Sequence, residues 1–292
     1  VTENLVTHRT PKAKYQKKYD PKNSQFDMLK KYELSIKDHY ELKNYCEKLN
    51  IEFLSSPFDL DSLNLLKKLK TKKIKIPSGE ITNIPLLREI GKSDTEIILS
   101  TGMSNLNEID IAIKNLTNSG LQRNNITLLH CNTEYPSPFE DVNLRVMNQL
   151  SKIFNLKVGY SDHTVGIEVA ISAVALGAKV LEKHFTLNRD FLGPDHKASI
   201  EPKDFKKLVT SVRNIEKALG IKFKQPTKSE IKNLSIVRKS IVASKLIKKG
   251  DTLSKNNLTV KRVGNGLSSS LWDEVVGKIS NRNYYKDDLI EK

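Results

Sequence analysis

The chain has 292 residues, of which 38% are hydrophobic, so it can bury a core and is not a wholly disordered polypeptide. Lysine and arginine number 49 against 34 aspartates and glutamates, a formal net charge of +15, but the lysines are spread along the chain. No basic motif with interleaved aromatics indicates nucleic-acid binding, and no apolar run approaches the roughly 20 residues of a membrane span. Two cysteines, Cys46 and Cys131, cannot form a disulfide framework. We therefore expect a cytoplasmic protein that binds an anionic small molecule, with neither a nucleic-acid nor a membrane partner.

Short apolar runs alternate with amphipathic segments from residue 51 to residue 220. Six runs of strand length are rich in Ile, Leu or Val, at residues 51–55, 73–76, 96–100, 126–130, 156–161 and 179–184. Helical patterns between them cover residues 60–69, 106–116 after a Ser104 cap, and 164–178. A last helix begins near Pro202, turns Phe205, Leu208 and Leu219 inward, and stops at Gly220. This alternation predicts a parallel sheet with right-handed helical crossovers.

The strand spacing suits either a doubly wound sheet or a (β/α)8 barrel. No G-x-G-x-x-G sequence follows a strand, so a nucleotide-binding sheet has little support. A closed barrel of this kind needs eight strands, and residues 1–50 offer one helix pattern after Ser35 but no comparable strand. We therefore expect a barrel that lacks its first two strands, which would lie upstream of Val1.

The pattern changes after the last predicted helix. A polar, lysine-rich linker is expected at residues 222–234, following an incomplete barrel domain at residues 1–221. Residues 235–292 contain short β-like runs at 240–243 and 258–262, with turn signals at 248–251 and 264–266. They predict a small β-rich second domain.

Polar side chains follow the carboxyl end of each predicted strand, where parallel barrels carry their chemistry. His163 and His184 end neighbouring strands. They suit a divalent metal with open coordination positions, although two hydrogen-bonded histidines remain an alternative. His130 directly continues an apolar strand and is expected to be structural. A lysine and several hydroxyls suit the phosphate and carboxylate of an anionic ligand; they are Ser56, Lys75, Ser78, Ser100 and Ser161.

A basic tip at residues 261–266 stands out in the small domain. It contains Arg262, the last residue of the predicted run at 258–262, followed closely by Gly264 and Gly266. It is either an exposed tight turn or a device that delivers an arginine to a ligand.

The segments above resemble the bacterial sialic acid synthase family, that is, the phosphoenolpyruvate-dependent N-acetylneuraminate synthases and their legionaminate and pseudaminate relatives. The matching segments cover nearly the whole chain: FLSSPF at 53–58, KIPSGE at 75–80, LSTGM at 99–103, LHCNTEYP at 129–136, GYSDH at 159–163, EKHFT at 182–186, GPDH at 193–196 and KRVGNG at 261–266. The resemblance implies a TIM-type barrel, a small antifreeze-like (SAF) domain and a domain-swapped homodimer.

The resemblance also implies a role for each matched residue. His163 and His184 would hold a divalent metal, usually Mn²⁺, and Glu80 would be the acid–base candidate of the catalytic set. The phosphoenolpyruvate-binding residues would be Ser56, Lys75, Ser78, Ser100 and Ser161. Tyr135 and Asp195 would contact the amino sugar, together with Arg262 from the other subunit.

Two motifs of the family are not found in this sequence: a strand with Glu-Ile-Gly and Asn-His-Asn-Gly, and the Lys-Phe-Gln strand that follows it. In the family they supply a catalytic glutamate, a phosphate-binding lysine and a sugar-binding glutamine. Their absence agrees with the count of six strands, so we expect the chain to be a fragment. Ser56 stands where many relatives have Thr, and Val263 where Pro is usual; neither change removes a needed group.

The resemblance implies a carbon–carbon bond-forming transferase, an N-acetylneuraminate synthase. It would condense phosphoenolpyruvate with N-acetylmannosamine, a 2-acetamido sugar, and release phosphate by C–O cleavage. The segment of Thr133, Glu134 and Tyr135 favours this acceptor. Two alternatives stay open: a legionaminate or related nonulosonate synthase that uses a modified 2-acetamido sugar, and a non-catalytic carbohydrate-binding or coat-associated homologue.

Overall fold

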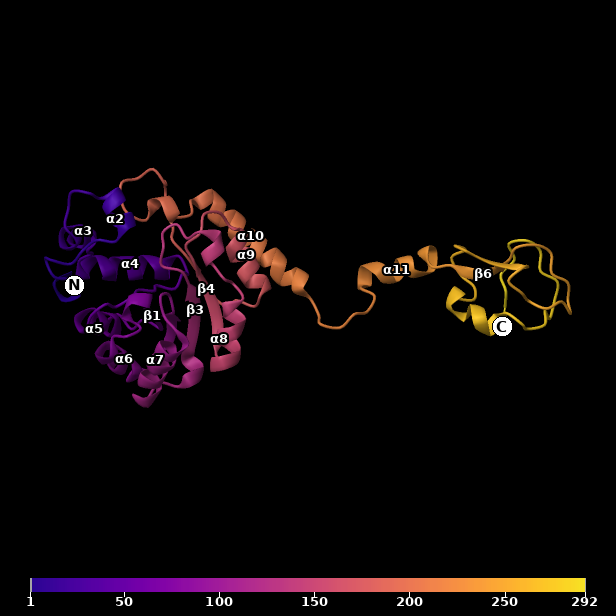
Figure 1. Cartoon of the computed structure of the whole chain (residues 1–292), viewed down its shortest axis with the longest axis horizontal. Coiled ribbons are helices and arrows are strands. Elements are labelled where there is room, and N and C mark those ends of the chain that lie inside the picture. Colours follow the sequence, from indigo (N-terminus) through magenta and orange to yellow (C-terminus); the bar gives the residue numbers. More distant parts are fainter. Residues whose placement is uncertain (1, 292) are drawn as a thin grey trace. The chain divides into compact units, whose positions relative to one another are not determined.

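A computed structural model describes residues 2–291 (Figure 1). The chain divides into two compact units, with the boundary between Gly220 and Ile221. Each unit has its own buried cluster of apolar side chains. Within residues 2–291, none of the helices is long and apolar enough to cross a membrane.

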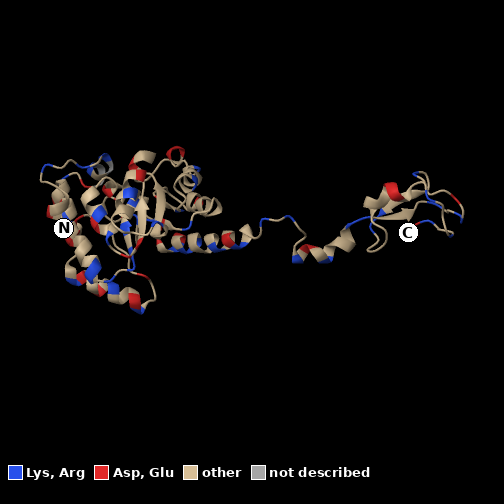
Figure 2. Cartoon of the chain, turned by 90° about the horizontal axis from the view of Figure 1, so that it is seen from below, with Lys and Arg blue, Asp and Glu red and all other residues tan. Residues whose placement is uncertain are grey.

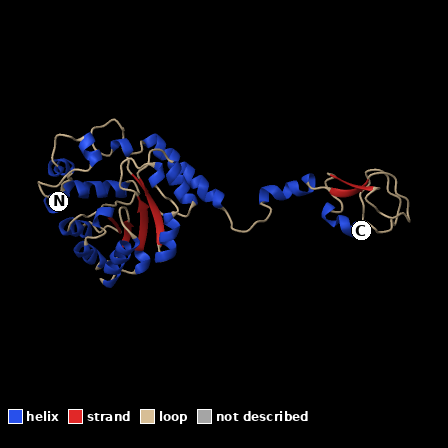
Figure 3. Cartoon of the chain, viewed as in Figure 1, coloured by secondary structure: helices blue, strands red, loops and turns tan. Residues whose placement is uncertain are grey.

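The larger unit is an α/β structure with one parallel sheet. Its strands are β1 (Lys73–Ile76), β2 (Glu96–Ser100), β3 (Ile126–Cys131), β4 (Lys157–Asp162) and β5 (Leu181–Lys183), paired in that order. Helices surround the strands (Figure 3): α5 (Leu60–Lys68), α6 (Ile84–Gly91), α7 (Leu106–Asn118), α8 (Val146–Phe154), α9 (Glu168–Ala175) and α10 (Pro202–Leu219). Short 3-10 turns lie at Ser78–Glu80, Arg123–Asn125, Phe139–Asp141 and His196–Ala198.

The sheet is strongly curled. In a flat sheet, four strand spacings of about 4.8 Å would separate β1 from β5 by roughly 19 Å. Yet Nζ of Lys75 on β1 lies 3.4 Å from Oε1 of Glu182 on β5. The sheet therefore bends around the face that carries these two side chains, and the unit is a half-barrel.

Alternation along the strands divides the residues between two faces. Side chains such as Ile76, Leu99 and Leu128 are fully buried and pack with the apolar stripes of the helices. On α7 this stripe includes Ile109, Ile113 and Leu116, which recur at helical spacing. The other face is concave, and it receives polar residues from the same strands.

Five of the six predicted strands are confirmed, with shifts of one or two residues at some ends. The prediction of a strand at residues 51–55 is wrong. This segment makes one long backbone hydrogen bond to β1, from Lys75 N to Ser55 O at 3.5 Å, and Ile51 is exposed. The sheet also extends beyond β5, where Phe185 and Ile200 form a parallel bridge that was not predicted.

Four helices precede the half-barrel: α1 (Thr2–Leu5), α2 (Lys14–Tyr19), α3 (Gln25–Tyr32) and α4 (Ile36–Lys48). The predicted helix after Ser35 is confirmed, because Ser35 caps α4 and exchanges hydrogen bonds with Asp38. The apolar residues of α4, such as Ile36 and Tyr45, are nevertheless exposed. The two further strands expected before residue 1 stay a prediction.

Several helix details differ from expectation. The cap of α7 is Asn105 rather than Ser104, because the Asn105 side chain accepts the backbone N–H of Glu108. Helix α9 begins at Glu168, not near residue 164, because the Asp162 carboxylate engages the backbone of Thr164 and Gly166 has a φ of 89°. Helix α10 ends before Gly220 as predicted, but Phe205 and Leu219 are exposed and Leu208 is buried.

The smaller unit contains α11 (Lys228–Val237), β6 (Ser240–Ala243), β7 (Leu258–Lys261), a 3-10 turn (Ser269–Leu271) and α12 (Trp272–Val275). Strands β6 and β7 pair in antiparallel fashion, which confirms both predicted β runs. The turn at residues 248–251 is closed by a hydrogen bond from Asp251 N to Lys248 O at 3.0 Å. Helix α11 was not anticipated, because its segment reads as a polar linker.

The basic residues are dispersed rather than gathered in one stripe (Figure 2). On α10, for example, Lys207 pairs with Asp204 at 2.9 Å and Arg213 with Glu216 at 2.8 Å. This distribution agrees with the spread of the lysines along the sequence.

Candidate active site

The polar residues of the concave face converge at the carboxyl ends of β4 and β5. Ser161 is paired with Glu182 in the register of the two strands, and His163 and His184 follow two residues later on each chain segment. Because side chains alternate along a strand, these four residues share one face. Parallel register thus brings together groups that are 21 residues apart in the sequence.

His163 and His184 lie side by side. Their ring centroids are 5.2 Å apart and the ring planes meet at 84°. Tyr135, from the segment after β3, packs against both, with its ring centroid 4.3 Å from that of His163 and 5.3 Å from that of His184. Three of the predicted site residues therefore form one aromatic cluster.

The protonation state of His163 suits a ligand to a metal. Its Nδ1 donates a hydrogen bond to the carbonyl oxygen of Asn132, which leaves the lone pair on Nε2, 3.3 Å from Ser161 Oγ. Burial lowers the pKa of His163 to about 4, an effect that the Asn132 hydrogen bond opposes only in part. The imidazole is therefore neutral near pH 7, as metal coordination requires.

His184 has a carboxylate neighbour. Its Nδ1 lies 3.9 Å from Oδ2 of Asp195, and the other oxygen of Asp195, Oδ1, is buried and has no hydrogen-bond partner among the described residues. Within the described residues, however, no group of three or more His, Cys, Asp or Glu side chains could hold a metal ion. The two imidazoles are thus the donors that this cluster offers to the expected metal, which stays a prediction.

A cation and a hydroxyl lie beside the histidines. Ser161 Oγ donates to Glu182 Oε1 at 2.7 Å, and Lys75 Nζ reaches the same oxygen at 3.4 Å. The structure thus joins Lys75 and Ser161, two of the residues expected to bind an anion. Glu182 was missed as a site residue, although it lies in the matched segment 182–186 and precedes His184 by two positions on the same face.

A second small cluster forms at the ends of β1, β2 and β3. Ser78 Oγ accepts the backbone N–H of Gly102 at 3.0 Å and lies 3.3 Å from Cys131 Sγ. A Cβ on Gly102 would come within 2.8 Å of Ser78 Oγ and 2.7 Å of Thr133, so only glycine allows this approach. Ser100 is the last residue of β2, two positions before Gly102, and it is buried.

Two predicted residues of the larger unit, Glu80 and Ser56, lie outside the contacts that form these two clusters. Glu80 accepts a hydrogen bond from Asn83 Nδ2 at 2.6 Å, and in the part of the chain that the structure describes no hydrogen bond or ion pair links it to His163 or His184. Ser56 follows the unpaired segment 51–55 and lines a cavity of about 610 Å³ shared with the N-terminal helices. Arg262 belongs to the smaller unit, where it directly follows β7 and is exposed.

His130 is structural, as expected. Its Nε2 lies 2.7 Å from the carbonyl oxygen of Val142, and burial lowers its pKa. Its ring faces Tyr160 on the neighbouring strand, at a centroid distance of 5.8 Å. His130 therefore ties the segment after β3 to the sheet.

Comparison with known proteins agrees with the resemblance read from the motifs. The chain is 53% identical over 291 residues to the N,N'-diacetyllegionaminic acid synthase of Campylobacter jejuni, covering 99% of this chain and 87% of that protein. It is 43% identical over 279 residues to the protein of the same name from Legionella pneumophila, covering 94% of this chain and 78% of the relative.

A solved structure supports the fold. The N-acetylneuraminic acid synthetase of Leptospira borgpetersenii superposes with a TM-score of 0.68 and 35% identity, covering 75% of this chain and 76% of the other. Residues 1–224 match the model of the NeuB family, and residues 238–292 match the model of the SAF domain. The chain therefore belongs to the NeuB family and carries a SAF domain after its half-barrel.

Proposed function

We propose that this protein is a nonulosonic acid synthase that condenses phosphoenolpyruvate with an open-chain amino sugar. The observation that carries the proposal is the convergence of His163, His184, Lys75 and Ser161 at one rim of the half-barrel. An enol phosphate needs a cation and hydroxyl donors, and a sugar aldehyde needs an electrophilic contact. Both requirements meet within this one cluster.

The proposed product is N,N'-diacetyllegionaminic acid. Two relatives of that name share 53% and 43% of their residues with this chain over nearly its whole length. Removal of the three carbons of phosphoenolpyruvate from such a product leaves a six-carbon aldose with two acetamido groups, which is the acceptor we propose. N-Acetylmannosamine, the acceptor favoured by the sequence alone, is the second candidate, and the likeness to the Leptospira N-acetylneuraminic acid synthetase supports it.

The reaction joins C3 of phosphoenolpyruvate to the aldehyde carbon. Water adds to C2 of the former enol, and phosphate leaves with cleavage of the C–O bond, so that all atoms of both substrates and water are accounted for. We propose that Lys75 and Ser161 release Glu182 and bind the phosphate or carboxylate, with Ser78, Ser100 and Ser56 as further donors. Glu80 is the proposed acid–base group.

The histidines are the proposed metal ligands. Mn²⁺ bound at His163 and His184 would supply Lewis acidity toward the sugar aldehyde. Tyr135 holds both rings in place, and Asp195 offers an unsatisfied oxygen beside His184 that suits a sugar hydroxyl. We further propose that Arg262 completes the sugar site from the partner in a domain-swapped homodimer.

Phosphate release tests the proposal directly. The protein is incubated with phosphoenolpyruvate, Mn²⁺ and either the diacetamido aldose or N-acetylmannosamine, and the nine-carbon product is identified by mass spectrometry. We expect faster release with the diacetamido sugar, and loss of turnover after chelation or in His163→Ala. Sugar binding without phosphate release would instead support the non-catalytic homologue, and turnover that survives chelation would reject the metal assignment.

A further inference from the structure

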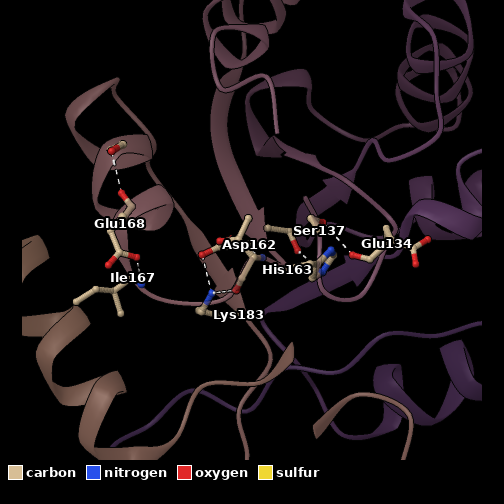
Figure 4. A network of polar contacts seen from close by, with 10 residues as sticks. Glu134, Ser137, Asp162, His163, Ile167, Glu168 and Lys183 are labelled. Atoms are coloured by element: carbon tan, nitrogen blue, oxygen red, sulfur yellow. Dashed lines mark hydrogen bonds and ion pairs between the residues drawn. The ribbon is translucent and has the colours of Figure 1, made fainter. Parts of the chain in front are cut away.

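Behind the two histidines, on the opposite face of the sheet, lies a buried ion pair between Lys183 and Asp162 (Figure 4). We propose that this pair is a positioning device that sets the geometry of His163 and His184. The inference rests on the proposed metal site, and it assigns a function to two residues that do not face the substrate.

The register of the strands places the pair directly before the histidines. Asp162 on β4 is the partner of Lys183 on β5, and each is followed by a histidine. Strand β5 has three residues, so this is the last regular rung of the ladder. A contact that holds Asp162 and Lys183 together therefore also sets the distance between the two chain segments that carry His163 and His184.

The ion pair also holds the backbone on both sides of His163. Lys183 Nζ lies 2.7 Å from Asp162 Oδ2 and donates to the carbonyl oxygen of Thr164 at 2.8 Å. Asp162 Oδ1 accepts from Thr164 N at 2.9 Å and from Thr164 Oγ1 at 2.7 Å. His163 therefore lies between two residues that share one polar network, which holds the backbone on both sides of it.

A second set of contacts holds His163 from the loop side. The carbonyl oxygen of His163 accepts the backbone N–H of Ser137 at 2.9 Å, and Ser137 Oγ donates to the carbonyl oxygen of Glu134 at 2.9 Å (Figure 4). These contacts place the segment that carries Tyr135 but do not involve β5. The Tyr135 ring touches both imidazoles, and Ser161 on β4 bonds Glu182 on β5 at 2.7 Å. The Lys183–Asp162 pair adds a side-chain link between β4 and β5 on the rung directly before the histidines.

Burial shows that the pair is not an ordinary surface contact. The side chains of Lys183 and Asp162 are 4% and 0% exposed. A buried charge is costly unless it is paired and hydrogen-bonded, and a pair of apolar residues often gives equal or greater stability. Stability alone therefore does not explain the pair, whereas a requirement for fixed direction does, since each charged group makes bonds in defined directions.

The informative variant removes both charges at once. In Asp162→Asn/Lys183→Met no unpaired charge remains buried, so the protein is expected to fold. The matched control is Asp110→Asn/Lys114→Met, which removes an exposed ion pair on α7. We would measure the melting temperature, the Kd for Mn²⁺ by calorimetry, and the ring nitrogen shifts of His163 by ¹⁵N NMR of the metal-free protein, assigned through His163→Gln.

The positioning role predicts a specific combination of results. The Asp162→Asn/Lys183→Met protein should bind Mn²⁺ about 10–100-fold more weakly, and its His163 should lose the single Nδ1–H tautomer that the Asn132 contact selects. The control should match the wild type in both. An unchanged Kd together with an unchanged tautomer, in a folded double variant, would overturn the inference.

Two further results keep the test decisive. If the double variant does not fold, Thr164→Val removes one hydroxyl bond to Asp162 while keeping shape, and it should weaken Mn²⁺ binding by about threefold; wild-type affinity there counts against positioning. If the wild type itself binds no Mn²⁺, the proposed metal site is wrong. The tautomer comparison then still decides whether the pair positions His163.

Discussion

Gly159 on β4 provides the most direct test of how closely the sheet is packed beneath the site. A Cβ at this position would lie 2.3 Å from the carbonyl oxygen of Val180 and 2.7 Å from Leu129 Cδ2. Real Cβ atoms essentially never approach closer than 3.0 Å, so the Val180 backbone would have to retreat by about 0.7 Å. Val180 accepts the N–H of Tyr160 at 2.9 Å and leads directly into β5.

The substitution Gly159→Ala should therefore affect stability and catalysis together. Overpacking of this kind costs about 1–3 kcal/mol of unfolding free energy. Because β5 carries Glu182 and leads into His184, the same retreat misaligns the site, and a displacement approaching 1 Å can cost about 100-fold in rate. We expect a destabilisation of about 2 kcal/mol and a fall in kcat of about 10–100-fold.

Gly91→Ala is the matched control. Its Cβ would lie 2.5 Å from the carbonyl oxygen of Leu116, where α6 packs against α7 away from the histidines. Both variants should unfold at lower urea concentration, but only Gly159→Ala should lose turnover per folded molecule in the phosphate-release assay. Equal turnover in the two variants would refute the claim that the close contact of Gly159 with the Val180 backbone determines the geometry of the site.

Three further predictions concern single side chains. In the metal-free protein, the pKa of His163 is lowered from 6.5 to about 4, so the unfolded chain binds the proton more tightly. The stability contributed by neutral His163 is complete above about pH 6.5, and roughly 3 kcal/mol of it is lost as the pH falls toward 4. In urea unfolding, the free energy of unfolding should therefore depend less on pH in His163→Gln than in the wild type. Parallel pH profiles of the two proteins would contradict this. Tyr160→Phe removes a buried hydroxyl that makes no hydrogen bond within the part of the chain that the structure describes. Stability should therefore stay equal or rise by up to about 1 kcal/mol, and a clear loss in thermal melts would count against this. Tyr135→Ala removes the packing of this ring on both imidazoles. It should lower stability by about 0.5–1.5 kcal/mol per imidazole and weaken Mn²⁺ binding, whereas Tyr135→Phe should preserve the packing. Equal effects of the two changes would show that the ring of Tyr135 does not stabilise the imidazoles.

The parallel sheet could be predicted because its strands are buried on one face by helices. Residues 73–76 and 96–100 are short Ile- and Leu-rich runs between turn signals, and the structure gives them the same bounds. Residues 51–55 have a similar composition but lack a regular ladder of hydrogen bonds, so composition alone misled. The bridge between Phe185 and Ile200 could not be predicted, because a paired segment this short shows no alternation of apolar and polar residues.

The proximity of the histidines followed from strand order, since parallel neighbours end at the same rim. The contact of Lys75 with Glu182 did not, because it depends on how far the sheet curls. A carboxylate within a strand also reads as an ordinary polar residue until its partners are known. For the same reason, sequence spacing could not show that Glu80 turns to Asn83.

The excursion between β5 and α10 has one further consequence. Its two ends are hydrogen-bonded to each other: Ile200 N donates to His184 O at 2.8 Å, and Thr186 N donates to Ile200 O at 3.0 Å. Between these anchor points the chain carries Asp195 and runs through Leu192, which is 91% exposed. Lengthening a loop whose ends are already fixed costs little, roughly 0.6 kcal/mol per doubling. The stretch between Thr186 and Ile200 can therefore change in length at small cost, while the backbone that carries His184 stays anchored to Ile200.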